Sequence, residues 1–190
     1  MPAASASAKL ATLDPTLKRL LTQDKGHLET TRLPIITVSA SFKEDLKGWY
    51  GLPENESLPD IVLSRAHYSM ALAIATQAWG KKIDKEKAWI FDPTNYVSQE
   101  DWKKIQLTEL VGKTLARHSL LKSLKDIIDK WGRNKLPILS SIQPSLLHVT
   151  KDMSHPILSL HIAAGNILAE SGKTVLQVIT DPHIRSDYLT

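Results

Sequence analysis

The sequence predicts an α/β fold in which a mostly parallel sheet is covered by helices on both faces. Six short apolar runs are typical of buried strands, and they lie at residues 33–39, 60–64, 87–91, 136–141, 156–160 and 174–180. Helical patterns precede or separate these runs at residues 14–21, 69–79, 99–131 and 161–170. Because strands that alternate with helices are typical of parallel sheets, the order of elements indicates a Rossmann-like domain.

The composition limits the classes of protein and site that the chain can form. It has 190 residues, a formal net charge of +4 and no cysteine. This length fits one α/β domain with a sizeable core. The lack of cysteine excludes a disulfide scaffold, a cysteine zinc site and a thiol nucleophile. No apolar run approaches the roughly 20 residues that span a bilayer, and the first residues lack a signal-peptide pattern, so we expect a cytoplasmic protein.

Residues 1–32 are expected to form an N-terminal arm with one short helix. Asp14 is a suitable N-cap, and Pro15 suits the first helical position because its missing N–H is not needed there. A polar stretch, residues 22–32, follows the predicted helix. Residues 33–190 then form the single Rossmann-like domain.

The elements of that domain have recognisable compositions and ends. β-Branched residues dominate the strand predicted at residues 33–39. The helix predicted at 69–79 is rich in small residues and is followed by Gly80, and the helix at 161–170 is followed by Gly172. Glycine is common directly after helices because it adopts positive φ without strain. These glycines therefore predict where the two helices end.

Polar side chains follow the carboxyl ends of the predicted strands. In chain order they are Ser64, Arg65, His67, Asp92, Asn95, Ser140, Ser141, Gln143, His161, Asp181 and His183. The carboxyl ends of parallel strands meet at one edge of a sheet, where α/β proteins bind their ligands. The set therefore predicts a substrate-binding site at this edge. Turns are polar for structural reasons alone, so each residue also has a purely structural interpretation.

His67 and Asp181 are the catalytic candidates of this set. His67 lies just before a predicted helix, whose dipole disfavours the imidazolium form, and a general base must be neutral. Asp181 could orient a histidine or bind a sugar hydroxyl. The structural alternatives are a capping or packing histidine and a turn at Asp181-Pro182.

A metal site is an alternative use of the same edge. His67, Asp92, His161, Asp181 and His183 could supply nitrogen and oxygen ligands. The sequence has no His-x-His, His-Glu-x-x-His or paired-aspartate motif to support such a site. It also has no glycine-rich dinucleotide motif, P-loop or Gly-x-Ser-x-Gly elbow, so no cofactor is expected.

The basic charge is concentrated in residues 101–135, which carry nine Lys and Arg against four Asp and Glu. With its leucines and tryptophans, this segment could lie on an anionic membrane surface through Lys113, Arg117 and Lys125. The alternative is an ordinary amphipathic helix with its leucines on the sheet. No nucleic-acid recognition motif accompanies the charge, so no nucleic-acid partner is expected.

Three blocks of sequence together resemble a known family. The first is Ile61-Val-Leu-Ser-Arg-Ala-His-Tyr-Ser-Met-Ala-Leu-Ala, and the second is Trp89-Ile-Phe-Asp. The third pairs Ile157-Leu-Ser-Leu-His-Ile-Ala-Ala-Gly with Val175-Leu-Gln-Val-Ile-Thr-Asp-Pro-His. As an ordered set, residues 60–190 resemble the N-terminal domain of a GT-B glycosyltransferase of the monogalactosyldiacylglycerol synthase type.

The resemblance implies the half of the enzyme that binds the acceptor, often a membrane lipid. In this family an acceptor hydroxyl attacks the anomeric carbon of a nucleotide sugar. His67 matches the loop histidine that acts as a base or positions the acceptor. Asp181 and His183 match the end of the last strand before the interdomain cleft. We therefore expect a peripheral protein on the inner face of the membrane.

Two features of the sequence depart from the family. The segment from Ser64 to His67 lacks the family's glycines, and Arg65 would project where a phosphate is expected to approach the backbone. The second Rossmann domain, which binds most of the nucleotide sugar, does not lie within the 190 residues, so we expect no turnover without it. A small metal-dependent hydrolase and a non-catalytic binding module stay open as alternative functions.

Overall fold

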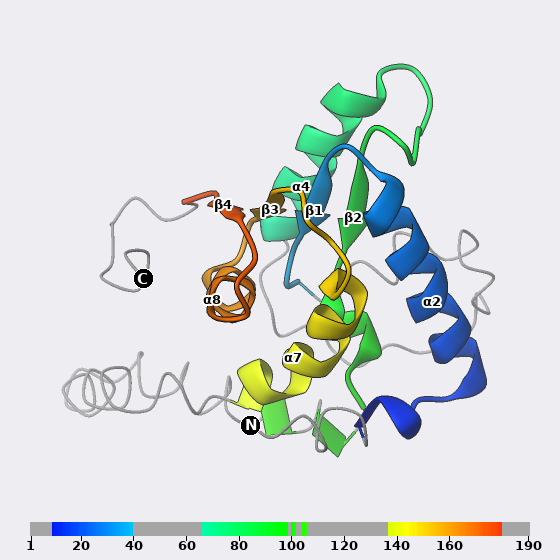
Figure 1. Cartoon of the computed structure of the whole chain (residues 1–190), viewed down its shortest axis with the longest axis vertical. Helices are drawn as coiled ribbons and strands as arrows, with labels where there is room; N and C mark the ends of the chain where they lie inside the picture. Colours follow the sequence, from blue (N-terminus) through cyan, green and yellow to red (C-terminus); the bar gives the residue numbers. More distant parts are fainter. Residues whose placement is uncertain (1–8, 40–65, 99, 102–103, 106–136, 180–190) are drawn as a thin grey trace, which may run out of the picture.

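The computed structural model describes residues 9–39, 66–98, 100–101, 104–105 and 137–179 (Figure 1). Within these ranges, four strands form one sheet in the order β2-β1-β3-β4, and every neighbouring pair is parallel. The strands are β1 (Pro34–Ile36), β2 (Trp89–Phe91), β3 (Ile157–Ser159) and β4 (Val175–Gln177). The parallel sheet confirms the predicted α/β fold.

The paired residues of neighbouring strands are mostly apolar, and they lie in the apolar runs from which the strands were predicted. Ile35 of β1 lies opposite Ile90 of β2 and Leu158 of β3. Leu158 in turn lies opposite Leu176 of β4. All three residues of β1 are buried, as expected for a central strand that is covered on both faces. The strand predicted at residues 60–64 lies outside the described residues.

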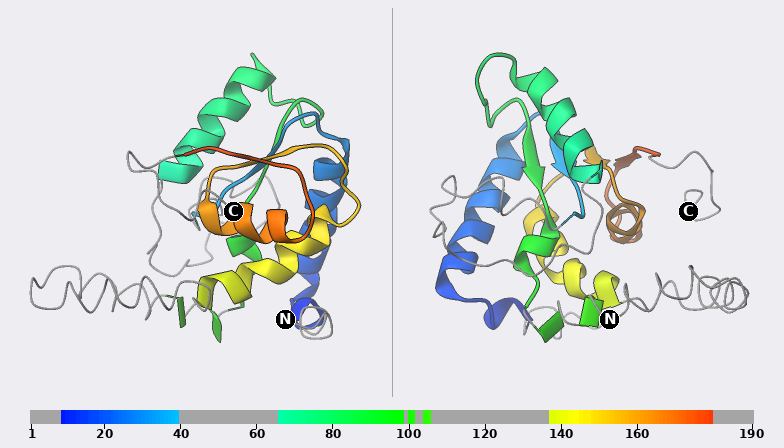
Figure 2. Two further views of the ribbon diagram at one scale, coloured as in Figure 1. Left: turned by 60° about the vertical axis from the view of Figure 1, so that its left-hand side comes forward. Right: turned by 180° about the vertical axis from the view of Figure 1, so that it is seen from behind.

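Helices cover both faces of the sheet, as predicted. Helix α4 (Ala66–Trp79) packs with Ile35 and Ile90 in one apolar cluster. The opposite cluster contains Ile36 and Phe91 together with residues of three further helices. These helices are α2 (Pro15–Thr30), α7 (Pro137–Thr150) and α8 (Ile162–Glu170). The left-hand view of Figure 2 shows α4 on one side of the strands and α7 and α8 on the other.

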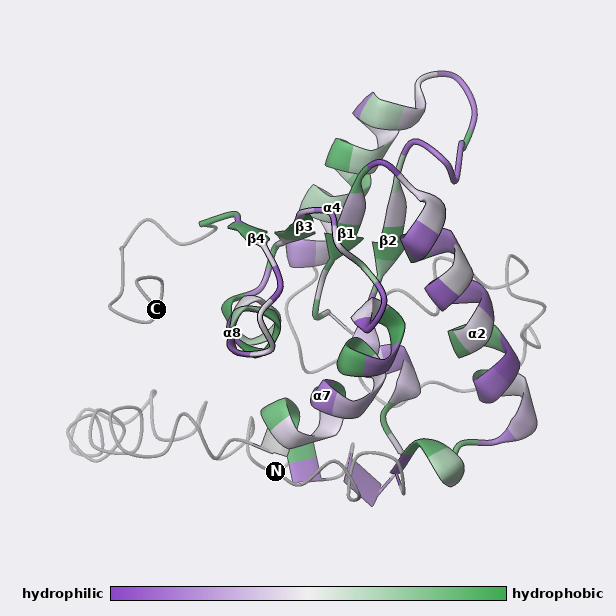
Figure 3. Ribbon diagram, viewed as in Figure 1, coloured by the Kyte–Doolittle hydropathy of each residue, from purple (hydrophilic) through white to green (hydrophobic). Residues whose placement is uncertain are grey.

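Helix α2 is longer than predicted and belongs to the core. Asp14 caps it by accepting hydrogen bonds from two backbone N–H groups of the first turn, at 2.6 and 3.0 Å. The helix then continues through the polar segment to Thr30. Leu20, Leu21 and Leu28 are buried in the same cluster as the sheet. The helix therefore extends nine residues beyond its predicted end at residue 21. Figure 3 shows a largely hydrophilic α2 beside hydrophobic strands.

A buried carboxylate joins α2 to the second strand. Asp24 is 3% exposed and accepts a hydrogen bond from Trp89 Nε1 at 3.0 Å. It also accepts one from the hydroxyl of Tyr96, which lies in the short 3₁₀ helix η1 (Pro93–Tyr96). Because buried carboxylates are costly unless they are hydrogen-bonded, these two donors explain how a charged residue occupies the core face of α2.

The fourth predicted strand, residues 136–141, was wrong, because residues from Pro137 onward belong to helix α7. Pro137 is the first helical residue, where a missing N–H costs nothing. A second proline, Pro144, lies inside α7 and leaves the carbonyl of Ser140 without its usual helical donor. Lys9 Nζ donates to that carbonyl oxygen at 3.4 Å. The apolar run therefore forms a helix on the sheet and not a strand within it.

The two glycine positions that predict helix ends are confirmed. Gly80 follows α4 with a φ of 77°, and Gly172 follows α8 with a φ of 80°. Most of residues 99–131, which predict a long helical region, lie outside the described residues. Among the helices that are described, none combines the length and the apolarity needed to cross a membrane.

Candidate functional site

The described sheet has a switch point between β1 and β3. The chain goes from β1 to β2 on one side, and it later enters β3 on the other side of β1. In open α/β sheets, ligands bind beyond the carboxyl ends of the strands at such a reversal. Ser39 follows β1 and His161 follows β3, while Asp92 comes directly after β2. These residues therefore lie along the edge where the sequence predicts a site.

Two predicted site residues, His67 and His161, meet at this edge. Their ring centroids are 5.1 Å apart, and the ring planes are inclined by 71°, in an edge-to-face arrangement. His67 lies in the first turn of α4, and His161 is the N-cap of α8. The two helices cover opposite faces of the sheet. The sequence predicted that both residues belong to one site, and the structure brings them into contact.

The surroundings of His161 keep its ring neutral near pH 7. Burial lowers the pKa of this imidazole, the positive charge of His67 lowers it further, and the resulting pKa is about 4. Nδ1 of His161 accepts a hydrogen bond from the backbone N–H of Ala163 at 3.2 Å. The neutral ring therefore carries its proton on Nε2. Ser159 Oγ donates to the carbonyl oxygen of His161 at 2.9 Å, which fixes the backbone before the helix.

These surroundings give the two histidines different chemical capacities. A ring with a pKa of about 4 is a poor proton acceptor near neutrality, so His161 is suited to donating a hydrogen bond from Nε2. His67 is the other imidazole of the pair, and it stands at the start of a helix. Of the two rings, His67 is therefore the candidate proton acceptor.

Asp92 is a buried carboxylate that holds together two segments at this edge. It is 1% exposed, and Oδ2 accepts hydrogen bonds from the N–H and hydroxyl of Ser39 at 2.9 and 3.0 Å. Oδ1 accepts from the N–H of Thr94 at 2.9 Å and also from its hydroxyl. Burial raises the pKa of Asp92, and the bonds from Thr94 and Ser39 oppose that rise. These contacts tie the segment after β1 to the segment after β2.

Within the described ranges, two oxygen atoms near this edge are buried and have no hydrogen-bond partner. They are Thr37 Oγ1, in the segment that follows β1, and Asn95 Oδ1, in the 3₁₀ helix η1 that follows Asp92. Most buried polar atoms in folded proteins have a protein or water partner. Asn95 was a predicted site residue. Thr37 was not, although it belongs to the predicted strand at residues 33–39.

Gln143 does not follow a strand. The sequence placed it after a fourth strand, whereas the structure places it inside helix α7, seven residues before the helix ends at Thr150. The error follows from the wrong strand at residues 136–141. Ser140 and Ser141 lie in the same helix and likewise do not follow a strand.

Sequence reasoning missed the two donors that hold Asp92. Ser39 is the last residue of the predicted first strand, so the rule that selected the other strand-end residues could have found it. Thr94 follows Asp92-Pro93, a pattern in which an aspartate commonly accepts from the backbone N–H two residues later. Both signals were local and present in the sequence.

Several predicted residues lie outside the described part of the chain. They are Ser64, Arg65, Lys113, Arg117, Lys125, Asp181 and His183. Among the described residues, no group of three or more His, Asp or Glu side chains is placed to hold a metal ion. A comparison with known protein families, curated proteins and solved structures finds no match to the chain.

Proposed function

We propose that the chain is the acceptor-binding half of a GT-B-like glycosyltransferase. The observation that carries the proposal is the contact between His67 and His161 at the switch point of the sheet. This position is where an α/β sheet binds small molecules, and the pair combines a hydrogen-bond donor with a candidate proton acceptor. The resemblance of residues 60–190 to the acceptor domain of this enzyme class supports the same assignment.

In the proposed reaction, the acceptor oxygen bonds to the anomeric carbon of a nucleotide sugar. The bond from that carbon to the phosphate oxygen breaks, and the nucleoside diphosphate leaves with the bonding electrons. His67 accepts the proton of the acceptor hydroxyl. His161, neutral because its pKa is about 4, donates from Nε2 to position the acceptor oxygen. Asp181 stays a predicted partner of His67.

The proposed partners are a nucleotide sugar and a hydroxyl acceptor, such as the headgroup of a membrane lipid. An anionic membrane that carries the lipid would meet the basic segment at residues 101–135. Lys113, Arg117 and Lys125 lie in that segment, and their membrane role stays a prediction because they are outside the described residues. Peripheral attachment on the inner face of the membrane is part of the same proposal.

The test measures sugar transfer by the complete gene product, because a second domain holds most of the nucleotide sugar in the enzymes that the chain resembles. The assay supplies labelled UDP-galactose and vesicles that contain diacylglycerol, and it follows label in the lipid. Replacing His67 with Gln should lower kcat by about 100-fold or more, which is the usual contribution of a general base. The KM for the nucleotide sugar should not change, because His67 does not bind the donor.

His148→Gln is the matched control, since His148 is exposed on α7 and lies outside the site. This variant should transfer sugar at the unsubstituted rate. Equal rates for the His67 and His148 variants would overturn the role of His67. Binding of the lipid without any transfer would overturn the enzymatic proposal and favour a binding module.

A further inference from the structure

A compact loop joins α4 to β2 at the amino edge of the sheet, opposite the edge that holds the two histidines. Residues 80–88 form this loop, and Asp84 organises it. The carbonyl of Asp84 accepts hydrogen bonds from the N–H groups of Lys87 and Ala88 at 3.1 and 3.2 Å. Asp84 Oδ1 accepts from the N–H of Glu86 at 3.1 Å, and Oδ2 lies 3.5 Å from Lys87 Nζ. The negative charge of Asp84 is therefore compensated by groups of the same loop.

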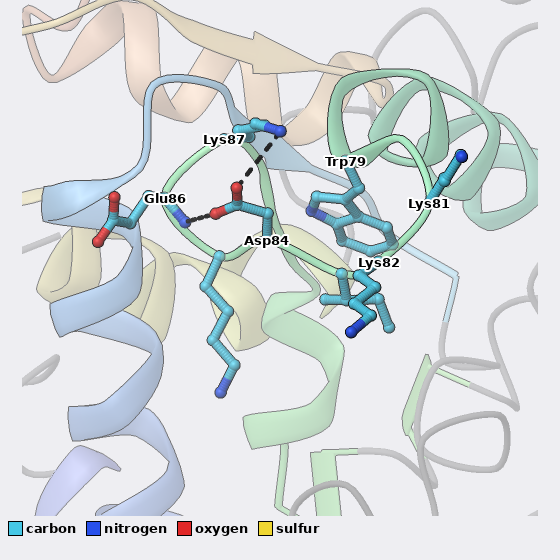
Figure 4. Close-up of a pocket in the computed structure, with 8 residues that line it drawn as sticks. Trp79, Lys81, Lys82, Asp84, Glu86 and Lys87 are labelled. Atoms are coloured by element: carbon cyan, nitrogen blue, oxygen red, sulfur yellow. Dashed lines mark hydrogen bonds and ion pairs between the residues drawn. The ribbon is translucent and has the colours of Figure 1, made fainter.

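The loop encloses an open hollow of about 610 Å³ (Figure 4). Trp79 and Ile83 form its apolar lining. Trp79 is held in place by a hydrogen bond from Nε1 to the carbonyl of Ala88 at 2.8 Å. Ile83 is 45% exposed. The hollow thus has a fixed apolar wall beside charged groups.

The remaining lining has a net positive charge, because it holds four lysines against Asp84 and Glu86. Lys81, Lys82 and Lys85 are exposed, and in the described part of the chain none of them lies within ion-pair distance of a carboxylate. Lys85 is placed by the ring of Trp89, whose centroid is 5.1 Å from Nζ. Figure 4 shows the carboxylate of Glu86 pointing away from Trp79. Lys85 Nζ also lies 3.4 Å from His27 Nε2, so Lys81 and Lys82 are the two cations beside the hollow that the described residues leave without an ion pair or ring contact.

We propose that this hollow, which we call the lysine pocket (Trp79, Lys81, Lys82, Ile83 and Lys85), binds a phosphate-bearing ligand. Lysine ammonium groups are common phosphate binders, and a phosphate can accept hydrogen bonds from several of them at once. The apolar wall would contact the non-phosphate part of the ligand. The phosphate could belong to a soluble molecule or to a lipid headgroup. The site is independent of the proposed acceptor site, which lies at the other edge of the sheet.

The test titrates the whole chain with two probes, inorganic pyrophosphate and vesicles of phosphatidylcholine with phosphatidylglycerol. Amide NMR signals report where pyrophosphate binds, and sedimentation reports vesicle binding. The test variant is Lys81→Ala with Lys82→Ala. The control variant is Lys18→Ala with Arg19→Ala, which removes two adjacent exposed cations from α2. Circular dichroism checks that both variants fold like the unsubstituted chain.

The proposal predicts that pyrophosphate shifts the signals of residues 80–88, and that the test variant weakens binding by about tenfold or more while the control does not. If only the phosphatidylglycerol vesicles bind, with the same loss in the test variant, the phosphate comes from a lipid headgroup. If neither probe binds at millimolar phosphate, the proposal is overturned. Equal weakening in both variants also overturns it, because the attraction would then follow net charge and not the pocket.

Discussion

Lowering the pH from neutrality to about 4 should remove about 3 kcal/mol of stability through His161 alone. Burial, and then the charge of His67, lowers the pKa of this ring from 6.5 to about 4. The unfolded chain therefore takes up the proton first as the pH falls. The stability associated with the neutral ring is complete above pH 6.5 and is lost between 6.5 and 4. Each unit of pKa difference corresponds to about 1.4 kcal/mol, so the full loss is about 3.5 kcal/mol, and about 3 kcal/mol of it has occurred by pH 4, where half of the folded rings are protonated.

The variant His161→Asn isolates this effect. Asparagine is a good N-cap, so it keeps an acceptor for the N–H of Ala163 while removing the ring. Urea unfolding at neutral pH and near the folded pKa then gives the acid-induced loss of stability for each protein. His27 and His148, whose pKa values burial also lowers, contribute equally to both proteins and cancel in the difference.

We expect the unsubstituted protein to lose about 3 kcal/mol more than the variant over this range. Histidine NMR gives the pKa of His161 directly, from the shift of its Cε1–H signal with pH. In His67→Gln this pKa should stay well below 6.5, because burial is the larger cause of the lowering. A His161 signal that titrates near 6.5, or equal acid losses in both proteins, would refute the reasoning.

Two further predictions concern the core. Asp24→Ala should cost about 2–4 kcal/mol in urea unfolding, because it leaves the buried donors of Trp89 and Tyr96 without an acceptor. Gly165→Ala should cost about 1 kcal/mol, because the new Cβ would lie 2.0 Å from Gln177 Oε1, and the Gln177 side chain must then move and lose its hydrogen bond from Nε2 to the carbonyl of Val178. Adding Gln177→Ala removes the clash, so the double variant should be more stable than Gly165→Ala, and an equal or lower stability would contradict this.

The sheet was largely predictable, because buried parallel strands leave short apolar runs in the sequence. All four described strands lie inside predicted runs. The strand predicted at residues 136–141 was wrong because a short apolar run is as typical of a buried helix as of a strand. Three residues of α7 are buried at helical spacing, namely Ile142, Leu146 and Val149. Pro144 lies between them, and because proline is rare inside helices, the spacing did not lead to the prediction of a helix. Tertiary contacts, including that of Lys9 with the freed carbonyl, make the proline tolerable there.

The extent of α2 could not be predicted for a different reason. Its core face contains Asp24, where an apolar residue would have continued the pattern from Leu21 to Leu28. The residue is tolerated because Trp89 and Tyr96, more than 60 positions away in the chain, supply its donors. Local periodicity carries no information about such distant partners. The prediction therefore ended the helix at residue 21, where the apolar spacing is interrupted.

The candidate site was predictable in part. The position of His67 before a helix and of His161 after a strand follows from local patterns, and parallel pairing then brings strand ends to one edge. The contact between the two rings depends on how α4 and α8 approach each other. This approach is determined by the order of the strands, which local sequence patterns do not give. Gln143 lies inside helix α7 and not after a strand, because residues 137–141 of the predicted strand belong to that helix. Asp92 follows β2 as predicted, but its burial and its hydrogen bonds from Ser39 could not be predicted from the sequence.

The most direct test of the account asks whether the acceptor binds beside the two histidines. Dihexanoylglycerol, a soluble diacylglycerol, is titrated into the chain while the Cε1–H signals of its histidines are followed by NMR. The account predicts saturable shifts for His67 and His161 and none for His148, which is exposed on α7. Shifts confined to other histidines, or saturable binding that leaves the His67 and His161 signals unmoved, would contradict the assignment of this edge as the acceptor site.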